Sequence, residues 1–142
     1  MRLKIPTLNI DAAIEYVNLT PQGEMGVPNN TADVGWFDLG SRPGERGSAV
    51  IAGHLNAQDG GAGVFSQLSQ LKTGDKMSVE DESGTSFTFV VRESREYKPG
   101  YADEVFSQND GSHLNLITCE GFWDPGQKSY SKRLVVFTDM VE

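Results

Sequence analysis

Short runs of β-forming residues, separated by turn signals, cover most of this 142-residue chain. Apolar or alternating runs of this length are typical of strands. The best helical pattern is at 64–71, where Val64, Leu68 and Leu71 fall on one helical face. About seven or eight strands at short intervals predict a sandwich or a closed barrel, in one all-β domain. We expect strands at residues 5–10, 13–17, 48–53, 75–80, 85–91, 114–118 and 134–138.

The composition argues against several classes of function. The chain has 20 acidic and 12 basic residues and a net charge of −8, which disfavours binding to nucleic acid or to an anionic membrane. No apolar stretch reaches the roughly 20 residues that span a bilayer, and the first residues lack the apolar core of a signal peptide. We therefore expect any signal or membrane anchor to lie outside these 142 residues.

Cys119 is the only cysteine, so an internal disulfide and a zinc cluster of cysteines are both excluded. It ends the apolar run that begins at Leu114, and a polar loop follows it. A thiol at such a strand end is placed to act as a nucleophile, provided that a base is near. The long connections 98–112 and 120–131 flank this strand, and loops of that length often wall a substrate groove.

Two histidines are available as the base. His54 closes the strand expected at 48–53, whereas His113 enters the strand of Cys119 at its far end. Six strand positions span about 20 Å, so His113 is out of reach of the thiol, and we expect it to be a surface residue. His54 is therefore the candidate acid or base.

Arg133 starts the last expected strand, which would pair antiparallel with the strand of Cys119. An arginine stays charged and donates hydrogen bonds in a fixed fork, so it suits an oxyanion. The backbone N–H of Glu120 is a second candidate donor. Each residue also has a structural interpretation: a small core thiol, a structural histidine and a solvated charge. Position at three strand ends favours catalysis, but spacing by itself leaves both interpretations open.

Four ordered segments, which contain Pro6, His54, Cys119 and Arg133, resemble the sortases, the cysteine transpeptidases of the Gram-positive cell surface. The resemblance covers essentially the whole chain and implies one catalytic domain over residues 1–142. Stretches 64–68 and 71–75 also resemble the helix and the Gly-Asp turn that follow the family's histidine. The four ordered segments that carry the resemblance are Ile5-Pro6-Thr7-Leu8-Asn9-Ile10-Asp11-Ala12, Ala49-Val50-Ile51-Ala52-Gly53-His54-Leu55, Leu116-Ile117-Thr118-Cys119 and Ser131-Lys132-Arg133-Leu134-Val135-Val136.

The resemblance implies an eight-stranded sortase-type β-barrel with one or two short helices. The family's catalytic histidine, nucleophile and oxyanion arginine correspond to His54, Cys119 and Arg133. Thr118 corresponds to the threonine before the nucleophile, and we assign it, with Glu120, to substrate binding. Segments 34–37 and 42–47 resemble the actinobacterial classes E and F.

The function implied is cleavage of a sorting signal similar to Leu-Pro-x-Thr-Gly between Thr and Gly, through a Cys119 thioester. The acyl group would pass to an amine of a peptidoglycan precursor of the lipid II type. The implied location is the extracellular face of the cell membrane, through an anchor, with sorting-signal-bearing surface proteins as partners. The chemistry needs no cofactor or metal. Some sortases bind calcium through acidic loop residues, which here would be Asp103, Glu104 and Asp110.

Two alternatives stay open beside transpeptidation. One is a hydrolytic cysteine peptidase on the same barrel. The other is a non-catalytic β-barrel module of the cell surface, in which Cys119 is buried. The L,D-transpeptidases also use a cysteine, but their histidine lies a few residues before it, whereas His54 is far from Cys119 in this chain.

Overall fold

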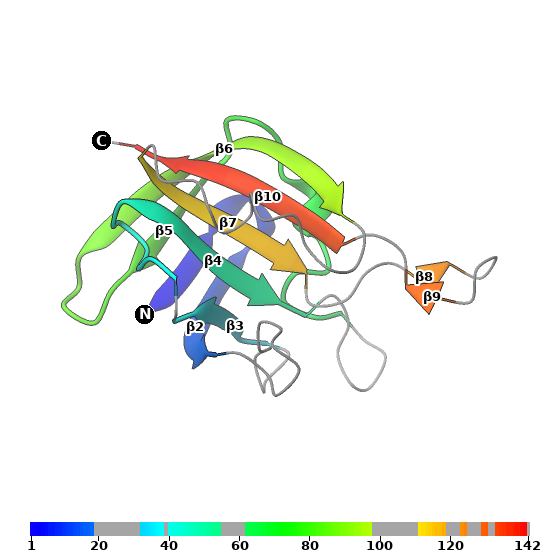
Figure 1. The fold of residues 1–142 in the computed structure, drawn as a ribbon, viewed down its shortest axis with the longest axis horizontal. Coiled ribbons are helices and arrows are strands. Elements are labelled where there is room, and N and C mark those ends of the chain that lie inside the picture. Colours follow the sequence, from blue (N-terminus) through cyan, green and yellow to red (C-terminus); the bar gives the residue numbers. More distant parts are fainter. Residues whose placement is uncertain are drawn as a thin grey trace.

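Eight strands close into a single barrel in the computed structural model of the chain (Figure 1). The structure describes residues 1–18, 32–38, 40–54, 62–97, 111–118, 123–124, 129–130 and 133–141. The barrel confirms the predicted all-β class and the closed eight-stranded form. In order around the barrel, its strands are β1 (Arg2–Ile5), β2 (Ile10–Val17), β3 (Val34–Phe37), β4 (Gly47–Gly53), β7 (Ser112–Thr118), β10 (Arg133–Met140), β6 (Ser86–Tyr97) and β5 (Lys76–Glu80).

Most neighbouring strands run antiparallel, and two pairs are parallel. The parallel pairs are β2 with β3 and β4 with β7. Strand β5 pairs with β1, which closes the barrel. A separate two-stranded sheet joins β8 (Trp123–Asp124) to β9 (Ser129–Tyr130). Two short 3-10 helices, η1 (Pro6–Leu8) and η2 (Leu68–Gln70), are the helical elements of the described residues.

Apolar side chains fill the barrel and also cover part of its outside. The inner cluster takes side chains from all eight barrel strands. A second cluster, which includes Val50, Ile117 and Val135, packs on the other face of β4, β7 and β10. All seven residues of β4 are buried, so the strand expected at 48–53 is covered on both faces. The C-terminal end of β4 is therefore fixed by packing on both faces of the strand.

Two expectations for local structure were wrong. The segment 5–10 is not one strand, because Pro6 opens η1 and Asn9 follows it with a left-handed φ of 57°. The segment 64–71 is not a regular helix, because turns occupy 64–67 and only η2 is helical. Leu68 and Leu71 are nevertheless buried. The apolar spacing therefore predicted which residues are buried. Packed against the barrel, the segment forms turns and a 3-10 helix instead of a regular helix.

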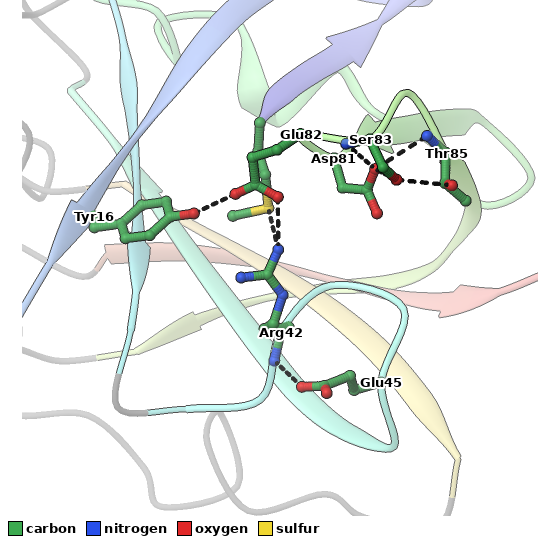
Figure 2. A network of polar contacts seen from close by, with 8 residues as sticks. Tyr16, Arg42, Glu45, Asp81, Glu82, Ser83 and Thr85 are labelled. Atoms are coloured by element: carbon green, nitrogen blue, oxygen red, sulfur yellow. Dashed lines mark hydrogen bonds and ion pairs between the residues drawn. The ribbon is translucent and has the colours of Figure 1, made fainter.

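An exposed polar network joins one strand and two connections at the barrel end where β4 begins (Figure 2). The Tyr16 hydroxyl donates a hydrogen bond to the Glu82 carboxylate, which also pairs with the Arg42 guanidinium at 2.9 Å. The Arg42 guanidinium lies 5.4 Å from the centre of the Trp36 ring, and the Tyr16 ring meets Trp36 edge-on at 5.1 Å between centroids. The network ties β2, the 41–46 loop and the β5–β6 turn together.

The network should make part of the stability dependent on acid. The hydrogen bond from Tyr16 is the main cause that lowers the pKa of Glu82 from 4.5 to about 2, with the Glu82 backbone N–H and Arg42 adding to it. The stabilisation by this carboxylate is thus present above pH 4.5 and is lost as the pH falls towards 2. Glu82→Gln should therefore lower the melting temperature above pH 4.5, and the difference from wild type should shrink towards pH 2.

Thermal unfolding at a series of pH values checks this expectation. The Glu82 side chain is 53% exposed, so the effect should be small and should weaken in high salt. A difference between the two proteins that stays constant over the whole pH series would contradict the role of the Glu82 carboxylate.

Candidate active site

Three strand ends meet at the barrel end opposite to the polar network. Strands β4 and β7 are parallel, and Gly53 at the end of β4 pairs with Thr118 at the end of β7. Strand β10 runs antiparallel to β7, with Val135 opposite Ile117, so β10 begins where β7 stops. Figure 1 shows the arrowheads of β4 and β7 on the same side of the barrel as the start of β10. In the sequence, His54 follows β4, Cys119 follows β7, and Arg133 is the first residue of β10.

The described part of the site contains His54, Thr118 and the backbone of Arg133. His54 directly follows β4 and is partly buried. Arg133 is the first residue of β10, and its partner in β6 is Tyr97. Cys119 and Glu120 lie outside the described residues, as do most of the two loops predicted to wall the groove. The structure thus brings His54, the end of β7 and the backbone of Arg133 together at one end of the barrel.

Thr118 joins the end of β7 to the start of β10. Its side chain is fully buried, and its Oγ1 accepts a hydrogen bond from the backbone N–H of Leu134 at 3.2 Å. This bond holds the backbone beside Arg133 against the last described residue before Cys119. The predicted contact of Thr118 with substrate stays a prediction.

Phe65 holds the backbone on either side of the candidate base. Its backbone N–H donates to the His54 carbonyl at 3.0 Å, and its ring lies directly over Gly53. A Cβ added at Gly53 would lie 2.5 Å from Phe65 Cδ2, closer than carbon atoms approach. Sequence reasoning missed this role of Phe65, whose only signal was an aromatic residue shortly after the Gly-His pair.

Replacing Gly53 by alanine should therefore destabilise the fold and disturb His54. We expect overpacking to cost about 1–3 kcal/mol of unfolding free energy, because Phe65 has to shift away from its buried position. Denaturant unfolding of Gly53→Ala measures the loss.

The double variant Gly53→Ala/Phe65→Leu provides the control. A smaller ring-free side chain at position 65 leaves space for the new methyl group, so the cost of Gly53→Ala should be smaller in the Phe65→Leu background. Equal costs in both backgrounds would show that the ring of Phe65 does not require glycine at position 53.

His113 is buried, and the expectation that it lies on the surface was wrong. Only 7% of the residue is exposed, and its Nδ1 lies 2.8 Å from Asp139 Oδ1. Position 113 faces Ser48 in β4 and Asp139 in β10, so neighbouring strands cover it on both sides. Its place at the opposite end of the strand from Cys119 is as expected, because Ser48 lies near the start of β4. His113 is a structural residue, and His54 remains the candidate base.

The described residues contain no group of three or more His, Cys, Asp or Glu side chains placed to hold a metal ion. The acidic positions considered for calcium, Asp103, Glu104 and Asp110, lie outside the described residues. Among the described ranges, no helix is long and apolar enough to cross a bilayer.

The structure is a closed eight-stranded β-barrel in which the ends of β4 and β7 and the start of β10 lie at one end, where the candidate site residues were predicted. The sortase domain model matches residues 3–141, so the chain belongs to the sortase family. Sortases are cysteine transpeptidases that act on surface proteins with sorting signals and on cell-wall precursors, and the chain is therefore a cell-wall sorting transpeptidase. No curated protein sequence matches the chain.

Solved sortase structures share the fold at low sequence identity. Sortase C-1 from Actinomyces oris is 24% identical with a TM-score of 0.78, and the match covers 99% of this chain and 73% of that one. Sortase A from Corynebacterium diphtheriae is 20% identical with a TM-score of 0.78, over 99% and 60% of the two chains. Sortase C from Clostridium perfringens SM101 is 22% identical with a TM-score of 0.72, over 99% and 68%. The similarity to classes E and F stays a prediction.

Proposed function

We propose that the chain cleaves a sorting signal similar to Leu-Pro-x-Thr-Gly between Thr and Gly and transfers the acyl part to an amine of a peptidoglycan precursor. The pairing of Gly53 with Thr118 carries the proposal. His54 and Cys119 each follow one member of this pair. Neighbouring strands lie about 4.8 Å apart, so the last residues of β4 and β7 lie side by side. Arg133 opens the strand on the other side of β7.

In the first step the Cys119 thiolate attacks the carbonyl carbon of the threonine residue. A C–S bond forms, and the carbonyl oxygen takes the negative charge, which Arg133 and the backbone N–H of Glu120 stabilise. Collapse of this intermediate breaks the Thr–Gly C–N bond. His54 gives a proton to the departing glycine amine, which leaves a thioester on Cys119.

In the second step the acceptor amine attacks the thioester. A new C–N bond forms, His54 takes the proton from the attacking nitrogen, and the C–S bond breaks to restore the Cys119 thiolate. Water in place of the amine gives slow hydrolysis. The reaction therefore needs no oxidant, reductant or further proton donor beyond these groups. The residues belong to one catalytic domain over 1–142, and we place it at the extracellular face of the membrane through an anchor outside these residues.

An assay with and without an amine separates the candidate functions. A peptide that contains the sorting signal, incubated with a primary amine, should give the amide product, and without the amine it should give the acid slowly. A hydrolytic peptidase would yield the acid in both reactions. A non-catalytic surface module would leave the peptide intact, and its cysteine would react slowly with an alkylating reagent under native conditions.

A further inference from the structure

An open pocket of about 460 Å³ lies beside the segment that contains Phe65. This volume is in the range of sites that hold small ligands. The pocket combines aliphatic walls with amide, hydroxyl and carboxylate side chains. Its walls are formed by residues Leu8 to Ala12, by Ala32, by Ala62 to Val64, and by Ser66 and Gln67.

The pocket opens at the same end of the barrel as the candidate active site. Strand β1 ends at Ile5, which pairs with Ile10 at the start of β2. Strand β2 runs parallel to β3, and Val34 at the start of β3 pairs with Gly53 at the end of β4. Helix η1 and the first residues of β2 therefore lie at the end where β4 stops and His54 follows.

The segment that forms one wall of the pocket also contains Phe65, whose backbone contacts His54. Val64 and Ser66 line the pocket on either side of Phe65 in the sequence. Phe65 donates its backbone N–H to the His54 carbonyl, and its ring is fixed over Gly53. The pocket and the candidate base are thus held by the same residue.

The strand order separates the pocket from the acyl side of the reaction. Around the barrel, β2 and β3 lie on one side of β4, and β7 and β10 lie on the other. Cys119 and Arg133 belong to the ends of β7 and β10, so the thioester forms on that side. The leaving amine takes its proton from His54. By microscopic reversibility, the acceptor amine attacks from the place that the leaving amine vacates.

Resting on the proposed function, we propose that this pocket holds the amine-bearing peptide chain of the acyl acceptor. Asn9, Ser66 and Gln67 offer hydrogen-bonding groups that suit the amides of a peptide. The carboxylate of Asp11, which is 61% exposed and pairs with Arg2 Nε at 2.8 Å, adds negative charge beside the pocket, which attracts a cationic acceptor chain. The bound chain presents its amine towards His54, which takes the proton when the C–N bond forms and the C–S bond breaks.

Two substitutions at the pocket test the proposal, each with a matched control. Gln67→Trp fills the pocket, and Gln70→Trp places the same side chain three residues further along, outside it. Asp11→Asn removes the pocket carboxylate, and Glu15→Gln makes the same charge change further along β2. At a subsaturating concentration of a glycine-containing peptide amine, Gln67→Trp should lower the ratio of amide to acid product roughly tenfold or more. Asp11→Asn should lower it in the same direction, and both controls should keep the wild-type ratio.

A binding measurement separates failure of this proposal from failure of the proposed function. In NMR titration of the Cys119→Ala protein with the same peptide amine, the amide signals of Gly63 and Gln67 should shift, and Gln67→Trp should suppress the shifts. An unchanged product ratio in both pocket variants would overturn the acceptor site and leave transpeptidation intact. If the wild type cleaves no sorting-signal peptide, the proposed function fails. In that case the NMR titration still tests whether the pocket binds the peptide amine, and absence of the shifts would overturn the acceptor site.

Discussion

Cys119→Ala should abolish formation of the amide product from a sorting-signal peptide, with a fall in turnover of at least about 10⁴-fold. The acyl group has to leave the peptide as a thioester, and alanine cannot form that bond. Quantification of amide and acid products by mass, at saturating peptide and amine, measures the loss. Both products should disappear together, because both derive from the same thioester.

Alkylation and folding provide the controls for this substitution. The Cys119→Ala protein should unfold at nearly the wild-type temperature, so that the loss is chemical. In the wild type, iodoacetamide should modify Cys119 rapidly, and His54→Gln should slow the modification, because a neighbouring base favours the thiolate. Turnover that survives Cys119→Ala would refute the assignment of the nucleophile.

Arg133→Ala should lower kcat by about 10²–10³-fold, which corresponds to about 2.7–4 kcal/mol of lost transition-state stabilisation. The guanidinium is expected to donate to an oxygen whose negative charge develops only in the transition state. The loss should therefore appear in kcat more than in KM for the peptide. Steady-state kinetics over a range of peptide concentrations separates the two.

Two further variants show whether the guanidinium fork matters. Arg133→Lys keeps the charge but loses the fixed pair of donors, so it should recover only part of the activity. Lys132→Ala removes the neighbouring cation, and it should leave kcat near the wild-type value. If Lys132→Ala and Arg133→Ala reduced kcat equally, the effect would reflect general charge rather than a specific oxyanion donor.

Local sequence patterns predicted the barrel strands well where a run of apolar or alternating residues marked the strand. The run at 48–53 became a strand with every residue buried, and the runs expected as strands at 75–80 and 85–91 became the antiparallel pair β5 and β6. Strand β3 was not expected as a strand, because it has only four residues and contains a glycine. It is formed by pairing with β2 and β4 on either side. Such pairing depends on segments that are distant in the sequence.

In the candidate site, too, local features were predictable from the sequence, whereas contacts between distant segments were not. His54, Cys119 and Arg133 are candidates because a thiol nucleophile needs a base and an oxyanion donor, and the structure places His54 directly after β4 and Arg133 first in β10. The partner of His113 was not, since Asp139 is 26 residues away and meets it only through the register of β7 and β10. Phe65 was missed for a similar reason, because its contact with Gly53 follows from how the chain returns to the barrel after His54.

The amino-acid sequence therefore specifies which reactive groups this protein has and that it can form a barrel. It contains a single cysteine, a histidine and an arginine next to expected strands, and enough β-forming runs for a barrel. Only the tertiary structure decided that β4 lies beside β7, that Gly53 pairs with Thr118, and that residues on either side of Phe65, which hydrogen-bonds to His54, line the pocket near η1. The physical reason is that strand propensity is local, whereas strand neighbours and register are chosen by hydrogen bonding and burial across the closed barrel.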